Sequence, residues 1–314
     1  MHENVSFNQD FLCALAAIVG EDGVLMAEPM SRHTTFQIGG PADVLVMPRT
    51  VDQLVRVLDA CAIAEAPMTV VGNGSDLLVG DRGVRGVVVL LRENLSAIEV
   101  DGFRVTAEAG ALLRDVAVAS ADAGLSGLEA LWGIPATVGG ACFMNAGAYG
   151  SQTSDVLESI QAYVPSRSGG RGSVHTFECR DLGMGYRKSR VNSDGLIVLR
   201  ATFRLVPDDP VAIRSSMDDY QARREEKQPL EMPSAGSTFK RPEGYFAGKL
   251  IMDAGLRGVR IGGAQVSEKH CGFVVNAGGA SAADVDALIE HIRSEVHDQF
   301  GVELEPEVRR IGEF

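Results

Sequence analysis

One stretch decides the fold of this chain: Gly133-Ile-Pro-Ala-Thr-Val-Gly-Gly-Ala-Cys-Phe-Met-Asn-Ala-Gly-Ala-Tyr-Gly150. It holds five glycines and no charged side chain. A helix of small residues packed closely against a sheet would explain it. However, each glycine inside a helix costs about 1 kcal/mol relative to alanine. That cost is easier to explain where a flat ligand must touch the backbone, so the stretch indicates a ligand site.

A second glycine-rich stretch, Val71-Gly-Asn-Gly-Ser-Asp-Leu-Leu78, follows a short apolar segment. Successive N–H groups in such a loop can bind an anion, although a plain tight turn explains it equally well. It is not a Walker A loop, and it lacks the third glycine of the dinucleotide fingerprint. Together the two stretches suggest a long ligand with phosphates in its middle.

Length and charge narrow the class of protein. The chain has 314 residues, 45% of them hydrophobic, which favours two or three domain-sized units. Its net charge of -13 argues against a nucleic-acid binder, which needs a basic surface for phosphates. An anionic ligand must therefore be held by locally gathered Arg and Lys. The five cysteines show no CxxC spacing, so we expect buried thiols in a reducing compartment and no metal site.

The apolar run Phe11–Val19 near the N-terminus is the one candidate for a targeting segment. No Lys or Arg precedes it, so it does not resemble a signal peptide. It is also far too short to span a bilayer. We therefore expect a cytoplasmic protein that does not bind a membrane.

The pattern of apolar residues predicts an α+β protein. We expect a hairpin across Asp101-Gly102 and a linker at 207–210. Residues 281–300 give the clearest helix, with a capping box at Ser281 and Asp284 and a stop at Gly301. The expected helices are 8–20, 51–64, 111–123, 211–227 and 281–300, and the expected strands are 44–47, 68–71, 84–91, 96–100, 103–107, 157–164 and 196–205.

Three further motifs contain side chains that can do chemistry. Gly183-Met-Gly-Tyr-Arg-Lys-Ser-Arg190 offers Arg187 as a forked donor to a carboxylate or enolate, although a solvated basic turn is equally plausible. Pro233-Ser-Ala-Gly-Ser-Thr-Phe-Lys-Arg-Pro242 offers Ser237 as a proton donor, although a loop hydroxyl more often bonds its own backbone. Leu304-Glu-Pro-Glu-Val-Arg-Arg310 offers Glu307, in a position where glutamates are usually solvated.

These five motifs, in this order, resemble the UDP-N-acetylenolpyruvoylglucosamine reductase family, flavoenzymes that make UDP-N-acetylmuramate for peptidoglycan. The resemblance implies a two-part FAD-binding unit of the vanillyl-alcohol-oxidase / p-cresol methylhydroxylase type, plus a C-terminal α+β substrate domain. The implied domains are 1–82, joined by a C-terminal strand at 303–314, then 83–208, and 209–302. The Lys-Arg-Pro run at 240–242 is similar to the shorter branch of the family, which lacks a substrate-covering Tyr loop.

The resemblance also implies the site. FAD is bound non-covalently and NADPH is the co-substrate. Arg187 and Glu307 hold an enolate, and Ser237 protonates the neighbouring carbon. Ala136 stands where Gly is frequent in the family, and Asp76 where Asn is frequent. The implied FAD contacts are Gly72, Asn73, Gly74, Ser75, Asp76, Gly133, Ile134, Pro135, Ala136, Thr137, Gly139, Gly140, Asn145, Gly147 and Ala148, and the implied substrate contacts are Tyr186, Lys227 and Arg241.

Two other hypotheses remain open at this point. One is another FAD oxidoreductase on the same fold with a different substrate, since a fold alone does not specify the reaction. The other is a non-catalytic nucleotide-binding protein. The expected partner is a sugar-nucleotide substrate, and a monomer is favoured.

Overall fold

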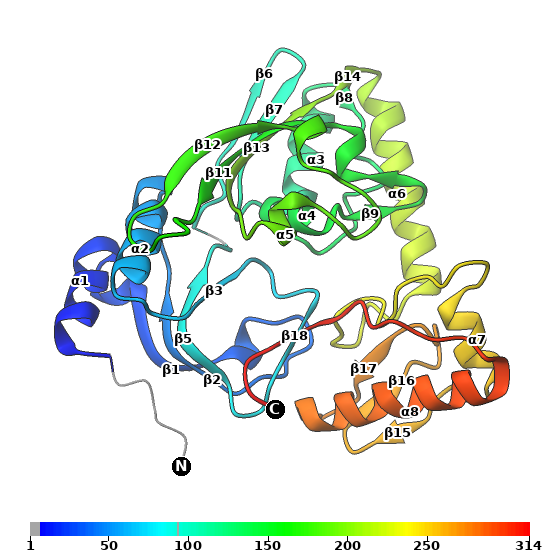
Figure 1. The fold of residues 1–314 in the computed structure, drawn as a ribbon. Coiled ribbons are helices and arrows are strands. Elements are labelled where there is room, and N and C mark those ends of the chain that lie inside the picture. The colour runs from blue at the N-terminus through cyan, green and yellow to red at the C-terminus, as the bar shows by residue number, and fades with distance from the viewer. Residues whose placement is uncertain (1–6, 93) are drawn as a thin grey trace. The chain divides into compact units, whose positions relative to one another are not determined.

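The structure, a computed structural model, describes residues 7–92 and 94–314 (Figure 1). Its contacts divide the chain into two units, each made of separate stretches. Of the described residues, the first unit contains those up to Met26, then Val44–Asn73 and Gly86–Arg223. The second contains Ala27–Asp43, Gly74–Arg85 and Arg224–Phe314. Each unit has its own apolar core. The three-domain division implied by the resemblance stays a prediction.

A four-stranded sheet has the order β1-β2-β5-β3. β3 and β5 are parallel, as expected for a strand–helix–strand arrangement. Strands β1, β2 and β5 each contribute residues to both units. The strands are β1 (Val24–Pro29), β2 (Pro41–Val46), β3 (Met68–Val71) and β5 (Val84–Leu90), and the helices of this region are α1 (Gln9–Val19) and α2 (Val51–Ile63).

A second sheet, in the first unit, is antiparallel and has the order β12-β11-β13-β7-β6. Its hairpin pairs Asp101 with Arg104, so the turn is Gly102-Phe103, one residue later than expected. Glycine takes the first turn position because φ there is 56°, which favours a residue without a side chain. The strands are β6 (Ile98–Asp101), β7 (Arg104–Glu108), β11 (Leu157–Val164), β12 (Ser173–Glu178) and β13 (Ile197–Arg204).

Two helices pack beneath this sheet, α3 (Leu113–Asp122) and α4 (Val138–Met144), and α4 contacts β13 (Figure 1). The expected linker at 207–210 is partly wrong. Val206–Pro207 forms β14, which pairs with β8 (Leu125–Ser126), and helix α6 (Pro210–Lys227) begins directly afterwards. The remaining elements of the first unit are β9 (Gly147–Ala148), β10 (Ser151–Gln152) and α5 (Arg190–Ser193).

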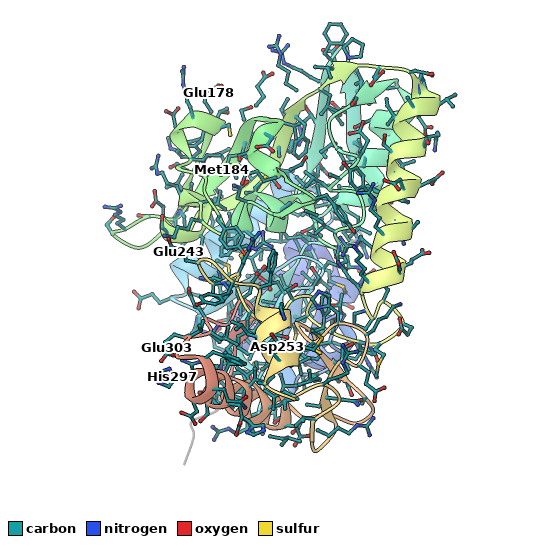
Figure 2. All side chains as sticks on the ribbon, turned by 90° about the vertical axis from the view of Figure 1, so that its right-hand side faces the viewer. Glu178, Met184, Glu243, Asp253, His297 and Glu303 are labelled. Atoms are coloured by element: carbon teal, nitrogen blue, oxygen red, sulfur yellow. The ribbon has the colours of Figure 1, made fainter. Side chains whose placement is uncertain are left out.

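The second unit packs α7 (Ala247–Asp253) and α8 (Ala282–Phe300) with a small antiparallel sheet. That sheet consists of β15 (Arg260–Ile261), β16 (Ala264–Val266) and β17 (Val274–Asn276). The capping box of α8 is confirmed, and Gly301 ends the helix with φ 66°. Near that end, Nδ1 of His297 lies 2.9 Å from Oε1 of Glu303. Figure 2 labels both residues at this end of α8.

A parallel pair of short strands brings the chain's C-terminal segment back to the first hundred residues. β18 (Arg309–Ile311) pairs with β4 (Leu77–Val79), as the resemblance implied. The N–H of Gly80 donates to the carbonyl of Ile311 (3.0 Å). A Cβ at Gly80 would lie 2.0 Å from the carbonyl oxygen of Glu313, so only glycine fits there. The segment that follows Glu307 is therefore fixed against the loop that follows Asp76.

The cysteines follow the expectation except at one position. Cys61, Cys142 and Cys271 are buried and Cys179 is half-buried, but Cys13 lies on the exposed side of α1. Burial raises the pKa of the Cys61 and Cys142 thiols to about 12, so neither is a nucleophile near neutral pH. Within 7–92 and 94–314, no helix combines the length and apolar character needed to cross a bilayer.

Candidate functional site

The two glycine-rich loops touch each other in the first unit. The side-chain amide of Asn73 donates to the carbonyl of Pro135 (2.6 Å). A Cβ at Gly72 would lie 2.2 Å from Oγ1 of Thr137, so that approach requires glycine. Thr137 in turn caps α4 by accepting a hydrogen bond from the N–H of Gly140. The sequence suggested one ligand spanning both loops, and their contact supports that interpretation.

The first turn of α4 contains two glycines, and protein packing explains only one of them. A Cβ at Gly139 would lie 3.2 Å from Cβ of Ala109, so packing limits that position. Gly140 is exposed, and its nearest neighbour would be Thr137 Oγ1 at 3.5 Å, an ordinary contact. Glycine at 140 therefore costs helix stability without a packing reason. Close approach of a ligand would explain it, and these loops are where we expect the pyrophosphate of FAD.

Gly140→Ala separates these two explanations. The apoprotein should unfold at the same or higher temperature, because alanine favours a helix by up to about 1 kcal/mol. FAD binding should weaken, because the new methyl group occupies the surface that the cofactor would touch. Thermal melting of the apoprotein and titration with FAD measure both effects. The matched variant is Gly139→Ala, which should lower the melting temperature through crowding against Ala109. Unchanged FAD affinity in Gly140→Ala would remove this loop from the site.

Asn145 ends α4 in the left-handed region, with φ 44° and ψ 56°. Asparagine is among the few residues that adopt this conformation readily. Its side chain is buried and bonds protein groups on three sides, so any contact of Asn145 with FAD would use its backbone. Farther on, Gly147 lies against the carbonyl of Ser151, at 2.6 Å from an added Cβ. The sequence did not reveal this internal role of Asn145.

Arg187 lies at the tip of a tight turn. The backbones of Gly185 and Lys188 exchange two hydrogen bonds (3.0 and 3.1 Å), and Tyr186 and Arg187 form the tip. Arg187 has φ 54°, which costs a non-glycine residue about 1–2 kcal/mol. Its guanidinium stacks over the ring of Tyr186, 5.1 Å from the centroid. Such strain is kept where a side chain must point in one direction, which fits a functional arginine.

Ser237 and Glu307 are brought together in the second unit by backbone pairing. The N–H of Glu307 donates to the carbonyl of Thr238 (2.8 Å), and that of Lys240 to the carbonyl of Glu305 (2.9 Å). Thr238 is buried, and its hydroxyl accepts a hydrogen bond from the N–H of Val274. Ser237 is exposed on the residue before Thr238, and Glu307, which pairs with Thr238, is half-buried on the other segment. Arg187 belongs to the first unit, so its place beside them stays a prediction.

The second half of the loop at 72–78 lies against the same C-terminal segment. A Cβ at Gly74, where φ is 61°, would meet the carbonyl oxygen of His33 at 2.2 Å. The carbonyl of Asp76 accepts a hydrogen bond from the N–H of Arg309 (2.9 Å), two residues after Glu307. Burial lowers the pKa of Arg309, and the Asp76 carboxylate opposes that shift. The loop at residues 74–78 and the segment that contains Glu307 are therefore joined by a backbone hydrogen bond.

The two basic side chains expected to bind the substrate are Lys227 and Arg241. Lys227 is exposed at the end of α6, and the Arg241 guanidinium lies 4.1 Å from the ring centroid of Phe246. Lys269, which the sequence did not single out as a contact, donates to the carbonyl of Glu225 (2.5 Å). Their contacts with a substrate, and that of Tyr186, stay predictions.

Two family models match the chain, the FAD binding domain over residues 42–167 and the UDP-N-acetylenolpyruvoylglucosamine reductase C-terminal domain over residues 228–311. The fold and the paired glycine loops thus define an FAD-dependent oxidoreductase. The expected FAD-binding unit with a C-terminal α+β domain is confirmed.

Comparison with individual relatives shows which FAD-dependent oxidoreductases this chain is similar to. The UDP-N-acetylenolpyruvoylglucosamine reductase of Agathobacter rectalis is 52% identical, covering 98% of this chain and 100% of that protein. That of Clostridium beijerinckii is 50% identical over 93% of this chain and 94% of its own length. The crystal structure of the Thermus caldophilus enzyme matches with a TM-score of 0.77 and 36% identity, covering 92% of this chain and 98% of that one. The chain belongs to the UDP-N-acetylenolpyruvoylglucosamine reductase family.

Proposed function

We propose that this chain reduces UDP-N-acetylglucosamine enolpyruvate to UDP-N-acetylmuramate, a reaction of peptidoglycan synthesis. The observation that carries the proposal is the backbone pairing of residues 238–240 with 305–307, which joins the segment that carries the Ser237 hydroxyl to the segment that carries the Glu307 carboxyl group. Reduction of an enolpyruvyl ether needs both kinds of group, because one carbon must gain a proton while charge develops at its carboxylate. The names of the relatives supply the substrate.

The cofactor has a defined place in this proposal. When bound, FAD supplies hydride from N5 to the methylene carbon of the enolpyruvyl group, with NADPH as the source of electrons. The loops at 72–76 and 133–140 would hold its pyrophosphate, with the backbone of residues 145–148 nearby. The contact between Asn73 and Pro135 keeps the first two loops together before the cofactor binds.

The side chains of this protein then have three tasks. Arg187 offers a forked donor to the substrate carboxylate as it gains enolate character. Glu307 stabilises the same charge, either as a protonated acid or through a hydrogen bond. Ser237 donates its proton to the carbon next to the carboxylate. A serine hydroxyl is a weak acid in water, so this transfer depends on sharing the developing charge among neighbouring donors.

The substrate's diphosphate would be held by Lys227 and Arg241, with Tyr186 near the sugar nucleotide. Both cations lie in the second unit, in a chain with a net charge of -13. Local cations are needed there, since the overall field repels an anionic substrate. All these residues belong to one chain, so a monomer suffices. NADPH and sugar nucleotides are metabolites of the cytoplasm, where we place the reaction.

One spectrum tests the proposal. The purified protein should have the visible absorbance of oxidised flavin, bleached by NADPH without oxygen and restored by the enolpyruvyl sugar nucleotide. Bleaching that this substrate does not reverse would indicate another oxidoreductase on the same fold. A colourless protein that does not take up FAD would contradict the proposal and favour a non-catalytic nucleotide-binding protein.

A further inference from the structure

Asn145 is held in one orientation by its hydrogen bonds. Its Nδ2 donates to Oε1 of Gln152 (3.0 Å) and to the carbonyl of Gly185 (3.1 Å). Its Oδ1 accepts from the N–H of Ser154 (2.9 Å). The side chain is 1% exposed, so water cannot replace these partners without opening the structure.

The bond to Gly185 reaches the turn that carries Arg187. Gly185 closes that turn with Lys188, and Arg187 is held between them with a positive φ. A second anchor joins the other side of the turn to the same helix, since the hydroxyl of Ser189 donates to the carbonyl of Phe143 (2.6 Å). Tyr186 and Lys188, on either side of Arg187, are exposed. The last residues of α4 thus hold both sides of the turn that carries Arg187.

Helix α4 therefore connects two parts of the proposed site within the first unit. Its first turn presents Gly139 and Gly140, where we place the cofactor's pyrophosphate. Its C-cap residue, Asn145, holds the Arg187 turn. The seven residues of the helix span about 10 Å at 1.5 Å per residue.

We propose that Asn145 is a positioning residue that sets the direction of Arg187 through the carbonyl of Gly185. The inference rests on the role proposed above for Arg187. Glycine would satisfy the left-handed backbone at this position but would remove the side-chain bond to the carbonyl of Gly185, which would keep only its bond from the N–H of Lys188. Asparagine supplies both the backbone conformation and the hydrogen bond.

Asn145→Gly tests the side chain without straining the backbone. Reoxidation of reduced flavin by the enolpyruvyl substrate should slow by about 10- to 100-fold, the effect of a misplaced catalytic group. Reduction of the flavin by NADPH should stay unchanged. Asn145→Ala should show the same kinetic loss with a lower melting temperature, because alanine is strained at φ 44°. The matched control is Glu65→Gly, which relaxes another positive-φ residue, φ 51°, on an exposed turn and should change neither half-reaction.

A double-mutant cycle with Arg187→Ala decides whether Asn145 acts through Arg187. In the Arg187→Ala background, Asn145→Gly should cause no further slowing of reoxidation. Multiplying effects would overturn the inference while leaving the role of Arg187 intact. If Arg187→Ala alone reoxidises normally, the role proposed for Arg187 fails, and the inference fails with it.

Limited trypsin cleavage of the FAD-free protein provides a readout that does not need activity. Arg187 and Lys188 are trypsin cleavage sites within the turn that Asn145→Gly would loosen. Cleavage after these residues should be faster in Asn145→Gly than in the unmodified protein, and unchanged in Glu65→Gly. Equal cleavage rates in all three proteins would show that Asn145 does not hold the turn, and would overturn the inference.

Discussion

In Ser237→Ala, reduction of the flavin by NADPH stays at its normal rate, while reoxidation by the enolpyruvyl substrate slows by about two to four decades. That range is the usual contribution of a positioned proton donor. Ser237 is exposed beside the buried Thr238, whose three hydrogen bonds fix the backbone. Removing one hydroxyl from this exposed position should therefore leave the fold intact. Stopped-flow absorbance of the flavin measures each half-reaction separately.

Ser234→Ala is the matched control for this experiment. Its hydroxyl accepts a hydrogen bond from the N–H of Gly236 (3.4 Å) in the same loop, but it has no proposed chemical role. Both half-reactions should stay near normal in this variant. If Ser237→Ala lost both half-reactions equally, Ser237 would be structural and the assignment of the proton donor would be wrong.

The second large effect is expected at Glu307. In Glu307→Ala, substrate-dependent reoxidation slows by about two to three decades, the cost of losing one donor aimed at developing negative charge. Glu307→Gln is expected to keep most of the rate if Glu307 acts as a protonated acid, since an amide also donates a hydrogen bond. Reduction by NADPH should be normal in both variants. The measurement is again single-turnover reoxidation, repeated across pH.

The pH series distinguishes the two ways in which Glu307 can act. A protonated Glu307 predicts a reoxidation rate that falls with rising pH, and no such fall in Glu307→Gln. Glu305→Gln is the control, because Glu305 lies two residues away, is exposed and pairs with Lys240. It should behave like the unmodified protein. Normal reoxidation in Glu307→Ala would exclude Glu307 from the chemistry.

The elements predicted correctly are those whose signal is local. Helix α8 has a continuous apolar stripe and a capping box, and β3 and β11 match their expected bounds. The elements that the apolar pattern did not reveal depend on distant partners. β4 and β18 have three residues each and exist because they pair with one another. β12 was missed because its residues are mostly exposed, so an edge strand of this kind shows no apolar alternation.

The candidate site was also predictable from the sequence only in part. Motifs reveal which residues are chemically capable, and Arg187, Ser237 and Glu307 were chosen on that basis. These side chains are held in place by contacts with residues outside their own motifs. The ladder beside Thr238 and the buried amide of Asn145 each join segments far apart in the sequence. An asparagine after a short helix is ordinary in a sequence, and only its three partners reveal its importance.

The pairing of β4 with β18 has a consequence for the order in which the chain can fold during synthesis. Residues 77–79 leave the ribosome early, but their partner strand at 309–311 emerges only after nearly all of the first unit. The long continuous part of the first unit, Gly86–Arg223, can form its own apolar core before that strand is synthesised. The second unit must wait, because its longest stretch, Arg224–Phe314, follows Gly86–Arg223 in the chain. The loop that precedes β4 therefore gains its final contacts late in synthesis, because β4 and β18 lie far apart in the sequence.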